Sequence, residues 1–441
     1  RLSAAPGGTM PDAKTPGGTP PHPDPTRTHP PPISPHTDTT TKAATVPMAE
    51  WSNWSGRIHA APHTILTPGS EDEIVQAVRS AADRGLSVRV VGAAHSHSPL
   101  VPTDGVLLDL AQLTGVVHAD GETLTARLRP GTRIADLGAP LRAQGVALLN
   151  QGDIDRQAIA GAVATGTHGT GSALRNLSAG LLGARIVRAD GSVEECSAQR
   201  EPELFEAARL NLGGLGILSE LTLRVRPAYR LQEKIWLEPV DAVLDRLDEL
   251  TGATRHFEFF WMPGSDRAAC KSLAETDAEP VYPLAEEGKR RGWSDEVLAN
   301  HRPDKHSEME YSIPKEHGAD CFRALRKMLH RDFPDLAWPL EYRTLAGDDV
   351  WLSTAYRRET VTLSVHQGVD QDDEPLFRAC EAIFRGYAGR PHWGKVHFQS
   401  GDDLAGLYPR WADWWRVRDQ WDPECRFLNP HLQALRPGAE G

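Results

Sequence analysis

The sequence predicts an α+β fold of two domains, on three observations. Its 441 residues suffice for two or three domains at roughly 150 residues each. Up to Pro227, short strands alternate with helices and glycine-rich turns. After Pro227 the pattern changes to longer strands and helices with more aromatic residues. We therefore place a domain boundary near residue 228 and predict domains over 48–228 and 229–441, preceded by a tail of residues 1–47.

The tail differs in composition from the rest of the chain. Residues 1–47 hold 12 of the 34 prolines and 10 threonines, with almost nothing to bury. Such a segment is predicted to be disordered. Met48 immediately precedes the first globular-looking residues, so an over-extended translation start is one interpretation of the tail.

Composition excludes several classes of protein. The net charge of −12 lies on the body of the chain, so we expect no nucleic acid and no anionic lipid as partner. No apolar stretch approaches about 18 residues, which predicts no membrane span, and no signal peptide is visible. Five widely spaced cysteines without a C-x-x-C pair argue against a disulfide framework and favour a reducing compartment. The sequence predicts a soluble cytoplasmic protein.

Caps and periodicity predict the elements of the first domain. Ser70 and Glu73 form a capping box, in which the serine caps the Glu73 amide and Glu73 reaches back. Apolar residues then recur at helical spacing until Gly85 ends the helix. Asp190-Gly191 predicts the turn of a hairpin. The remaining predicted elements are strands at 87–91, 106–110, 123–128, 146–150 and 221–225, and helices over about 133–144 and 202–210.

The second domain is predicted to contain strands and amphipathic helices in alternation. Its predicted strands lie at 257–261, 338–343 and 360–366, and its predicted helices cover about 316–331, 375–386 and 411–420. Residues 264–314 are charged and irregular in pattern, so we expect a surface excursion there.

Two turns rich in small residues, 92–98 and 165–171, point to a phosphate-bearing ligand. Successive backbone amides in such turns form concavities suited to a pyrophosphate. The alternative is that they are tight turns that pack small side chains. No G-x-G-x-x-G, P-loop, H-E-x-x-H or G-x-S-x-G motif occurs, so a conventional NAD site, a P-loop and an α/β-hydrolase triad lose support.

A few charged and imidazole side chains are candidates for chemistry. Glu341 and Arg343 are two residues apart on a predicted strand and should project from the same face. Such a pair could hold a hydroxyl-bearing substrate and accept its proton; the alternative is an ion pair on a solvent-exposed face. His95 and His97 permit a metal hypothesis, but no carboxylate or cysteine at ligand spacing accompanies them, and no metal is predicted.

In order and spacing, these motifs resemble the aldonolactone oxidoreductases of the vanillyl-alcohol-oxidase, or p-cresol-methylhydroxylase (PCMH), flavoprotein superfamily. The run 90–96 resembles the flavin loop G-x-G-H-S, and 161–171 resembles the segment that contacts the pyrophosphate. Residues 211–218 resemble the strand entry on the adenine side. Residues 392–395 and 422–430 resemble H-W-G-K and D-P-x-x-x-F-L-N. The likeness covers about 50–435.

The resemblance implies a PCMH-type FAD-binding domain of two α/β subdomains. A substrate-binding domain with an antiparallel sheet and flanking helices should follow it. The resemblance makes His95 the candidate for a covalent bond to the flavin 8α-methyl group, whereas His97 lies outside the matched position. The other residues it implies as FAD contacts or neighbours are Val90, Val91, Gly92, Ala93, Ala94, Ser96, Gly152, Asp153, Ala158, Gly161, Thr165, Gly166, Thr167, His168, Ile217 and His392.

The resemblance also implies a catalytic trio of Glu341, Arg343 and Lys395. Glu341 would accept the substrate proton, Arg343 would orient the substrate, and Lys395 would hold substrate oxygen and developing flavin charge. Hydride would pass from an aldono-1,4-lactone of the L-gulono or D-arabinono type to flavin N5, with dioxygen as acceptor and hydrogen peroxide as product. Alternatives are an alditol oxidase, a lactone dehydrogenase with another acceptor, or a flavin-free binding protein, which the retained trio and His95 argue against.

Five positions depart from the family pattern or bear on the electron acceptor. Asp153 stands where many relatives have a serine that contacts substrate in the alditol branch, which counts against an alditol. Ala158 replaces a hydroxyl residue that contacts FAD, and Ala93-Ala94 replace glycines. Gly152 falls at the oxygen-access position, which is small in oxidases and alanine in some dehydrogenases, and so favours direct reaction with dioxygen.

Overall fold

The computed structural model describes residues 49–438, and the disorder predicted for 1–47 lies outside the described residues. Helices and mainly antiparallel sheets share the described chain, which confirms the α+β class. Residues 48–441 form one contact unit, and the boundary near 228 stays a prediction. A two-stranded ribbon of β1 (Trp51–Ser52) and β2 (His59–Ala60) opens the described part.

The first layer is a parallel sheet in the order β3-β5-β4 beside helix α1. Its elements are β3 (Thr64–Leu66), α1 (Glu71–Asp83), β4 (Val88–Val91) and β5 (Val106–Asp109). The Glu73 amide donates to Ser70 Oγ, and the Glu73 carboxylate accepts from the Gly69 amide rather than from Ser70. The predicted Ser70 cap is therefore confirmed, whereas the predicted return bond from Glu73 to the Ser70 amide is wrong, because the carboxylate binds the Gly69 amide instead.

The second sheet runs in the order β10-β9-β11-β7-β6, with β8 also paired to β11. The predicted hairpin is confirmed, and Gly191 takes φ 75° in its turn. The helix predicted over 133–144 is divided into a 3-10 turn, Ile134–Asp136, and a short α2. The elements of this part are β6 (Val116–Asp120), which was not predicted, β7 (Thr125–Leu128), α2 (Gly138–Ala143), β8 (Val146–Leu148), α3 (Ile159–Ala164), β9 (Leu181–Val187), β10 (Val193–Ser197), α4 (Pro202–Ala208) and β11 (Ile217–Pro227).

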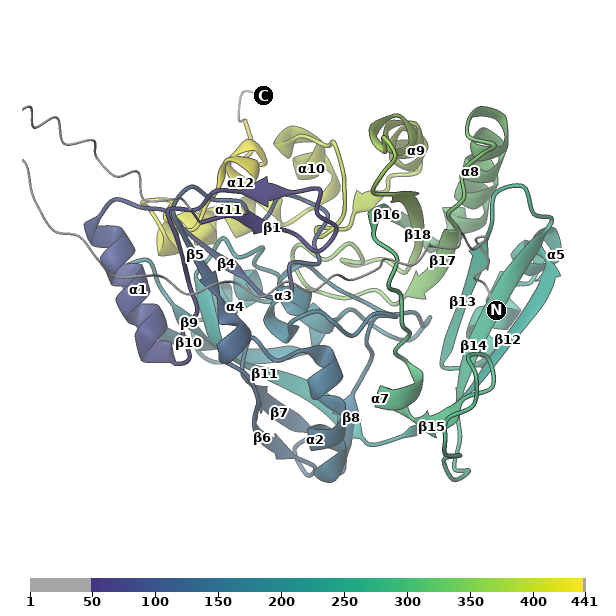
Figure 1. Ribbon diagram of the computed structural model, residues 1–441, viewed down its shortest axis with the longest axis horizontal. Helices are drawn as coiled ribbons and strands as arrows, with labels where there is room; N and C mark the ends of the chain where they lie inside the picture. Colours follow the sequence, from purple (N-terminus) through teal and green to yellow (C-terminus); the bar gives the residue numbers. More distant parts are fainter. Residues whose placement is uncertain (1–48, 439–441) are drawn as a thin grey trace, which may run out of the picture. The chain divides into compact units, whose positions relative to one another are not determined.

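The third sheet has eight strands in the order β15-β12-β14-β13-β17-β18-β16-β19. One face is apolar, with Phe259, Tyr342 and Leu363 buried, and α8 and α9 lie against it (Figure 1). Its elements are β12 (Arg230–Pro239), α5 (Val240–Asp245), α6 (Leu247–Ala253), β13 (His256–Trp261), β14 (Arg267–Glu275), β15 (Arg291–Trp293), α7 (Ser294–Val297), β16 (His306–Pro314), α8 (Gly318–Asp332), β17 (Leu340–Leu345), β18 (Thr360–Gly368), α9 (Glu374–Gly386) and β19 (Arg390–Pro391).

The expectation that 264–314 is an irregular surface excursion is wrong. The segment contributes β14, β15 and β16 to the large sheet, and β16 is buried along nearly its whole length. In β16, Glu308 and Glu310 alternate with Met309 and Tyr311. The face of this sheet that lies opposite the apolar one is buried but polar. Its charged residues therefore give the sequence pattern that is expected of a solvent-exposed segment.

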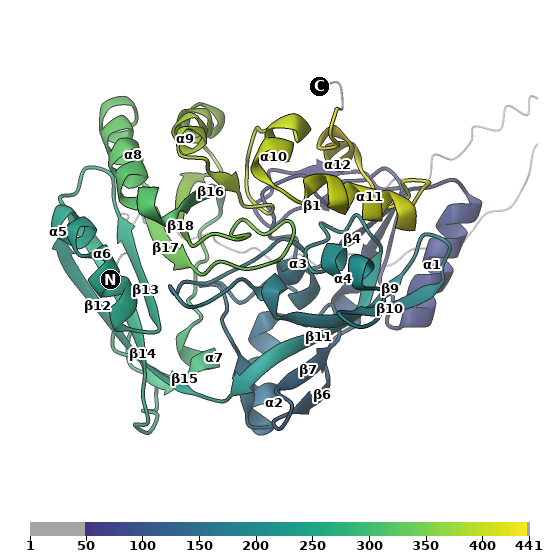
Figure 2. The ribbon, with the colours of Figure 1, turned by 180° about the vertical axis from the view of Figure 1, so that it is seen from behind.

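The C-terminal helices return to the first half of the chain (Figures 1 and 2). They are α10 (Gly401–Leu407), α11 (Trp411–Trp421) and α12 (Pro430–Ala434). Trp414 is fully buried and donates to the carbonyls of Ala207, in the last turn of α4, and of Leu210, just after it. The Val88 amide donates to the Arg426 carbonyl. The core around β11 is therefore completed by residues some 200 positions later in the chain.

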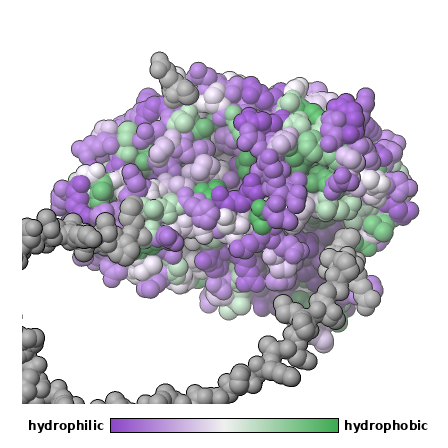
Figure 3. Space-filling model, turned by 45° about the horizontal axis from the view of Figure 1, so that its top comes forward, coloured by the Kyte–Doolittle hydropathy of each residue, from purple (hydrophilic) through white to green (hydrophobic). Residues whose placement is uncertain are grey.

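The molecular surface is mainly hydrophilic on the face drawn in Figure 3, where apolar residues are scattered. Within residues 49–438, no helix has the length and apolarity needed to cross a bilayer. The five cysteines are all unpaired thiols.

Candidate active site

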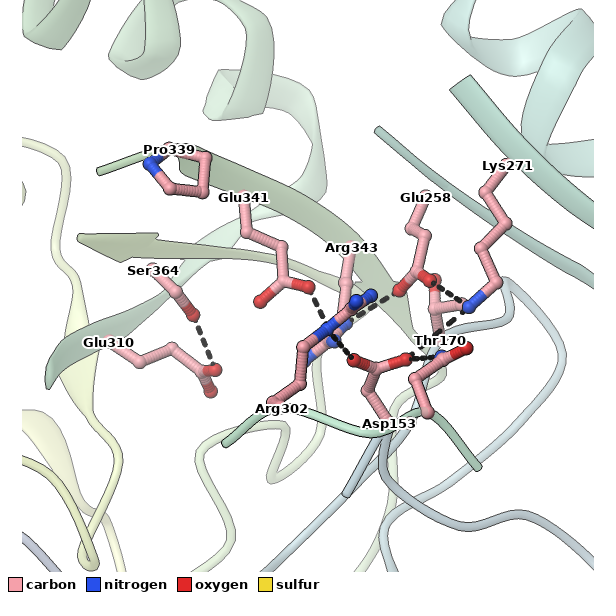
Figure 4. Close-up of polar contacts among 12 residues, drawn as sticks. Asp153, Thr170, Glu258, Lys271, Arg302, Glu310, Pro339, Glu341, Arg343 and Ser364 are labelled. Carbon is pink, nitrogen blue, oxygen red and sulfur yellow. Dashed lines mark hydrogen bonds and ion pairs between the residues drawn. The ribbon is translucent and has the colours of Figure 1, made fainter. Parts of the chain in front are cut away.

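The polar face of the eight-stranded sheet carries the predicted pair. Glu341 and Arg343 both project from β17, and their side chains are in contact, with 4% and 9% of each residue exposed. Arg343 Nε also donates to Glu258 Oε2 on β13 at 2.8 Å (Figure 4). The predicted common face is thus confirmed, and the pair is buried rather than on a solvent-exposed face.

The surroundings of Glu341 bring the pKa of its carboxyl group close to the neutral range. Burial raises the pKa of Glu341 to about 8, and the nearby carboxyl groups of Glu258, Asp153 and Glu308 act in the same direction against Arg343. A carboxyl group with a pKa near the working pH is suited to general base catalysis.

Lys395 lies on the loop after β19, where its ammonium group contacts Glu308 of β16. Burial alone would raise the pKa of Glu308, but the positive charge of Lys395 lowers it well below its usual range. Glu308, Glu341 and His366 place their ligand-type atoms within 4.8 Å of one another. The structure therefore brings Lys395 to the same polar face as the Glu341–Arg343 pair.

His97 and His306 also lie close to Glu308. The tertiary structure therefore brings to His97 the carboxylate that the sequence did not show at ligand spacing. Their Nε2 atoms lie 4.0 Å and 3.7 Å from Glu308 Oε2, and the three residues could form a metal-ligand set. His95 points elsewhere and stacks on Trp54 at 5.1 Å between ring centroids. Because Lys395 already neutralises this carboxylate, the absence of a metal stays our prediction.

His168 is buried and hydrogen-bonded to Glu310, which projects from the same polar face. Its Nε2 lies 2.6 Å from Glu310 Oε1, and its Nδ1 donates to the Gly169 carbonyl at 2.8 Å. Burial would raise the pKa of Glu310, but His168 lowers it below its usual range. Ser364 donates to the second carboxylate oxygen at 2.7 Å, and His392 lies 5.7 Å from His168 between ring centroids.

The glycine-rich segments meet at one place, as expected for a cofactor cradle. A Cβ on Gly92 would lie 2.6 Å from that of Ala158, at the start of α3. The Leu212 amide donates to the Ala164 carbonyl at 3.0 Å, and the His97 amide donates to the Gly394 carbonyl at 2.7 Å. Four segments that are remote in sequence therefore lie side by side.

The loop after β4 offers donors to a ligand. Within residues 49–438, the amides of Ala93, Ala94, His95 and Ser96 donate to no acceptor, and the loop is only partly buried. Unpaired consecutive amides fit an anionic or carbonyl-rich group such as those of FAD. Ala94 takes φ 57°, a conformation that favours glycine, which gives a physical reason for the family's glycine there.

The other predicted cofactor contacts occupy this region in different ways. Val90 and Val91 end β4, and Thr165, Gly166 and Thr167 follow α3, which contains Gly161. Gly152 lies against the His168 carbonyl, where an added Cβ would be 3.4 Å away. Ile217 is fully buried in the core with Ile74 and Phe427, so only its backbone can reach a ligand. Asp153 turns toward the large sheet, near Lys271.

Several charged residues of the site were not predicted from the sequence. They are Glu258, Lys271, Glu308 and Glu310, all less than 9% exposed, and Arg302. In β16, charged and polar residues alternate with Met309, Tyr311 and Ile313. This two-residue period indicates a strand with one polar face, and it could have been used to find Glu308 and Glu310. No comparable local signal marked Lys271, because its partners lie on other strands.

Comparison with known proteins identifies the class of this fold and site. A model of the FAD-binding domain matches residues 62–197, and a model described as D-arabinono-1,4-lactone oxidase matches 221–302 and 285–435. A solvent-stable cholesterol oxidase has a similar fold, with a TM-score of 0.78 at 17% identity over 88% of this chain and 97% of that chain. The fold and the glycine-rich cradle define an FAD-dependent oxidoreductase of the PCMH type.

Relatives in sequence give the family. L-Gulono-1,4-lactone dehydrogenase of Mycobacterium tuberculosis is 36% identical over 87% of this chain and 98% of its own length. Mouse L-gulonolactone oxidase is 26% identical over 88% and 98%, and an alditol oxidase of Streptomyces is 30% identical over 88% and 99%. The chain belongs to the aldonolactone oxidoreductase family, whose members oxidise CH–OH donors with FAD.

Proposed function

We propose that this protein oxidises an aldono-1,4-lactone of the L-gulono or D-arabinono type to a keto-lactone, with dioxygen as electron acceptor. The observation that carries the proposal is the buried Glu341–Arg343 pair beside Lys395, on the sheet face that meets the cofactor cradle. FAD, when bound, supplies the hydride acceptor. The names of the relatives support the substrate class.

Each side chain of the trio has a separate task. Ionised Glu341 takes the hydroxyl proton as the carbinol hydrogen leaves as hydride, which keeps the carbon–oxygen product neutral. Arg343, held by Glu258, donates hydrogen bonds to substrate oxygen, and its position is fixed before the substrate arrives. The Lys395 ammonium, anchored by Glu308, supplies positive charge where negative charge develops.

We also propose that FAD is bound covalently through His95. Burial lowers the pKa of His95 to about 4, so the ring is neutral at physiological pH and can act as a nucleophile. Neither ring nitrogen has a hydrogen-bond partner within residues 49–438. Stacking on Trp54 holds the ring in one orientation.

The decisive experiment is a substrate and acceptor panel on the purified holoenzyme. We expect peroxide formation with aldonolactones and slower turnover of xylitol or sorbitol. Fast alditol oxidation without lactone turnover would contradict the proposal. Lactone oxidation that needs an artificial acceptor and yields no peroxide would favour a dehydrogenase, the class named for the mycobacterial relative.

His95→Ala tests the covalent bond. Wild-type protein precipitated with acid should retain yellow, fluorescent flavin, whereas the variant should release it while still binding FAD before precipitation. His97→Ala is the matched control, because His97 neighbours the same loop but faces Glu308. Release of flavin from the wild-type protein would show that the assignment is wrong.

A further inference from the structure

A row of alternating charges leads away from the Glu341–Arg343 pair (Figure 4). Arg343 is bound to Glu258 at 2.8 Å, and Lys271 Nζ lies 3.1 Å from the other oxygen of that carboxylate. Lys271 also lies 3.3 Å from Asp153 Oδ1. With Lys271 only 3% exposed, these charges are held by one another rather than by water.

Both carboxylate oxygens of Asp153 accept hydrogen bonds from the protein. Its Oδ1 accepts from Lys271 and from Asn300, and its Oδ2 accepts from Arg302 Nε at 3.1 Å. Its backbone carbonyl accepts from the Asn300 amide at 2.8 Å. Burial would raise the pKa of Asp153, but Lys271 and Arg302 lower it, so the carboxylate stays ionised. Its role is therefore to orient the loop that carries Arg302.

Arg302 is the outermost cation of this row. Its Nη2 donates to Glu287 at 3.2 Å, its side chain is 37% exposed, and its Nη1 donates to no acceptor within residues 49–438. Figure 4 shows Arg302 reaching from its loop toward Glu341 and Arg343, and Glu341 is among the charges that act on it. A fixed guanidinium with a free donor beside the reactive carboxyl is a site for a substrate oxygen.

We propose that Arg302, oriented by Asp153, binds the carbonyl or carboxylate oxygen at C1 of the substrate and so selects lactones and aldonates over alditols. This inference rests on the proposed function and names a specificity residue for it. Guanidinium groups bind carbonyl and carboxylate acceptors strongly, whereas the terminal carbon of an alditol carries only a hydroxyl group. Lactone and ring-opened aldonate share this acceptor chemistry.

Arg302→Met is the test, because methionine keeps much of the length and removes every donor. We expect the KM for a lactone to rise about tenfold or more, as for a lost charge-assisted hydrogen bond. We also expect the ratio of kcat/KM for the lactone to kcat/KM for an alditol to fall about tenfold, because any effect of the lost charge on Glu341 is common to both substrates. Arg302→Lys should recover part of the loss, and Asp153→Asn should act in the same direction as Arg302→Met. Arg331→Met, on exposed α8, is the control.

Binding to the anaerobically reduced holoenzyme, which cannot oxidise the lactone, separates the two ligand sources and the two hypotheses. Calorimetry with lactone and with aldonate should show at least one ligand whose affinity falls about tenfold in Arg302→Met. That ligand identifies which oxygen Arg302 takes. Equal losses for lactone and alditol, unchanged KM, or no wild-type binding of either ligand would overturn the inference. Aldonate binding that depends on Arg302, without lactone turnover, would refute the proposed function alone.

Discussion

Glu341 is the residue whose chemistry depends most on its surroundings. An arginine in contact would ordinarily hold a carboxyl group ionised. Here burial and three neighbouring carboxyl groups outweigh Arg343, and they raise the pKa of Glu341 to about 8. The group is therefore protonated over part of the neutral range, and its charge is available only as pH rises.

This gives a pH dependence with a definite sign. Below about pH 8 protonated Glu341 cannot accept a proton, so kcat/KM should rise about tenfold per pH unit and level off above the pKa. Stopped-flow reduction of the flavin between about pH 6 and pH 9 would measure it. Glu341→Gln should lower the rate by about 10²–10⁴ and remove the dependence. A wild-type reduction rate that does not change with pH would contradict the role.

At the scale of elements, strand register assembles the site. β17 pairs with β13 and β18, and β18 pairs with β16. Glu341 lies opposite Ser364, and Ser364 lies opposite Glu310. A one-residue slip of β16 would turn Glu308 and Glu310 to the apolar face, so the burial of Met309 and Tyr311 also fixes the site's carboxylates.

Strand β4, which leads into the loop of residues 92–98, is held by one buried cation. Arg89 is 1% exposed and donates to the carbonyls of Leu100, Leu212, Gly213 and Phe427. Burial lowers its pKa to about 9, which leaves it charged at neutral pH. It thus joins β4 to the loops before β11 and before α12.

Arg89→Met should destabilise the protein by about 3 kcal/mol or more, because four buried carbonyls lose their donor. Thermal or urea unfolding followed by circular dichroism would measure the change. Arg200→Met, at an exposed ion pair, should cost less than about 1 kcal/mol. Equal effects of the two substitutions would refute this view of Arg89.

At the scale of the whole molecule, the N-terminal half and the C-terminal end share one core. Phe427 packs with Ile74 and Ile217, and Asn429 donates to the carbonyls of Pro99 and Pro102. The segment after residue 400 follows the eight-stranded sheet in sequence but packs against the first half of the chain in space. The first half of the chain therefore depends on the C-terminal segment to complete its core.

A chain that ends at residue 400 should not bind FAD and should not unfold cooperatively. Its truncation exposes the apolar surface that Trp411 and Trp414 cover in the full chain. Flavin content after gel filtration and a denaturant titration would show it. Co-expression of the missing segment as a separate peptide should restore some bound flavin. A truncated chain that is yellow and melts like the full chain would contradict this prediction.

The sequence alone determined the features that depend on neighbouring residues. The free amides after β4 follow from consecutive small residues, and the shared face of Glu341 and Arg343 follows from the two-residue period of a strand. The fold class followed from caps, periodicity and ordered motifs. The cytoplasmic location and the boundary near 228 stay predictions.

Only the tertiary structure decided what surrounds these groups. Glu258 meets Arg343 across 85 residues, and Glu308 meets Lys395 across 87. No local pattern encodes such contacts, because charged residues on a buried polar face look like solvent-exposed chain until the sheet is assembled. The raised pKa of Glu341 and the placement of Arg302 result from that assembly, since both depend on charges brought together from separate strands and loops.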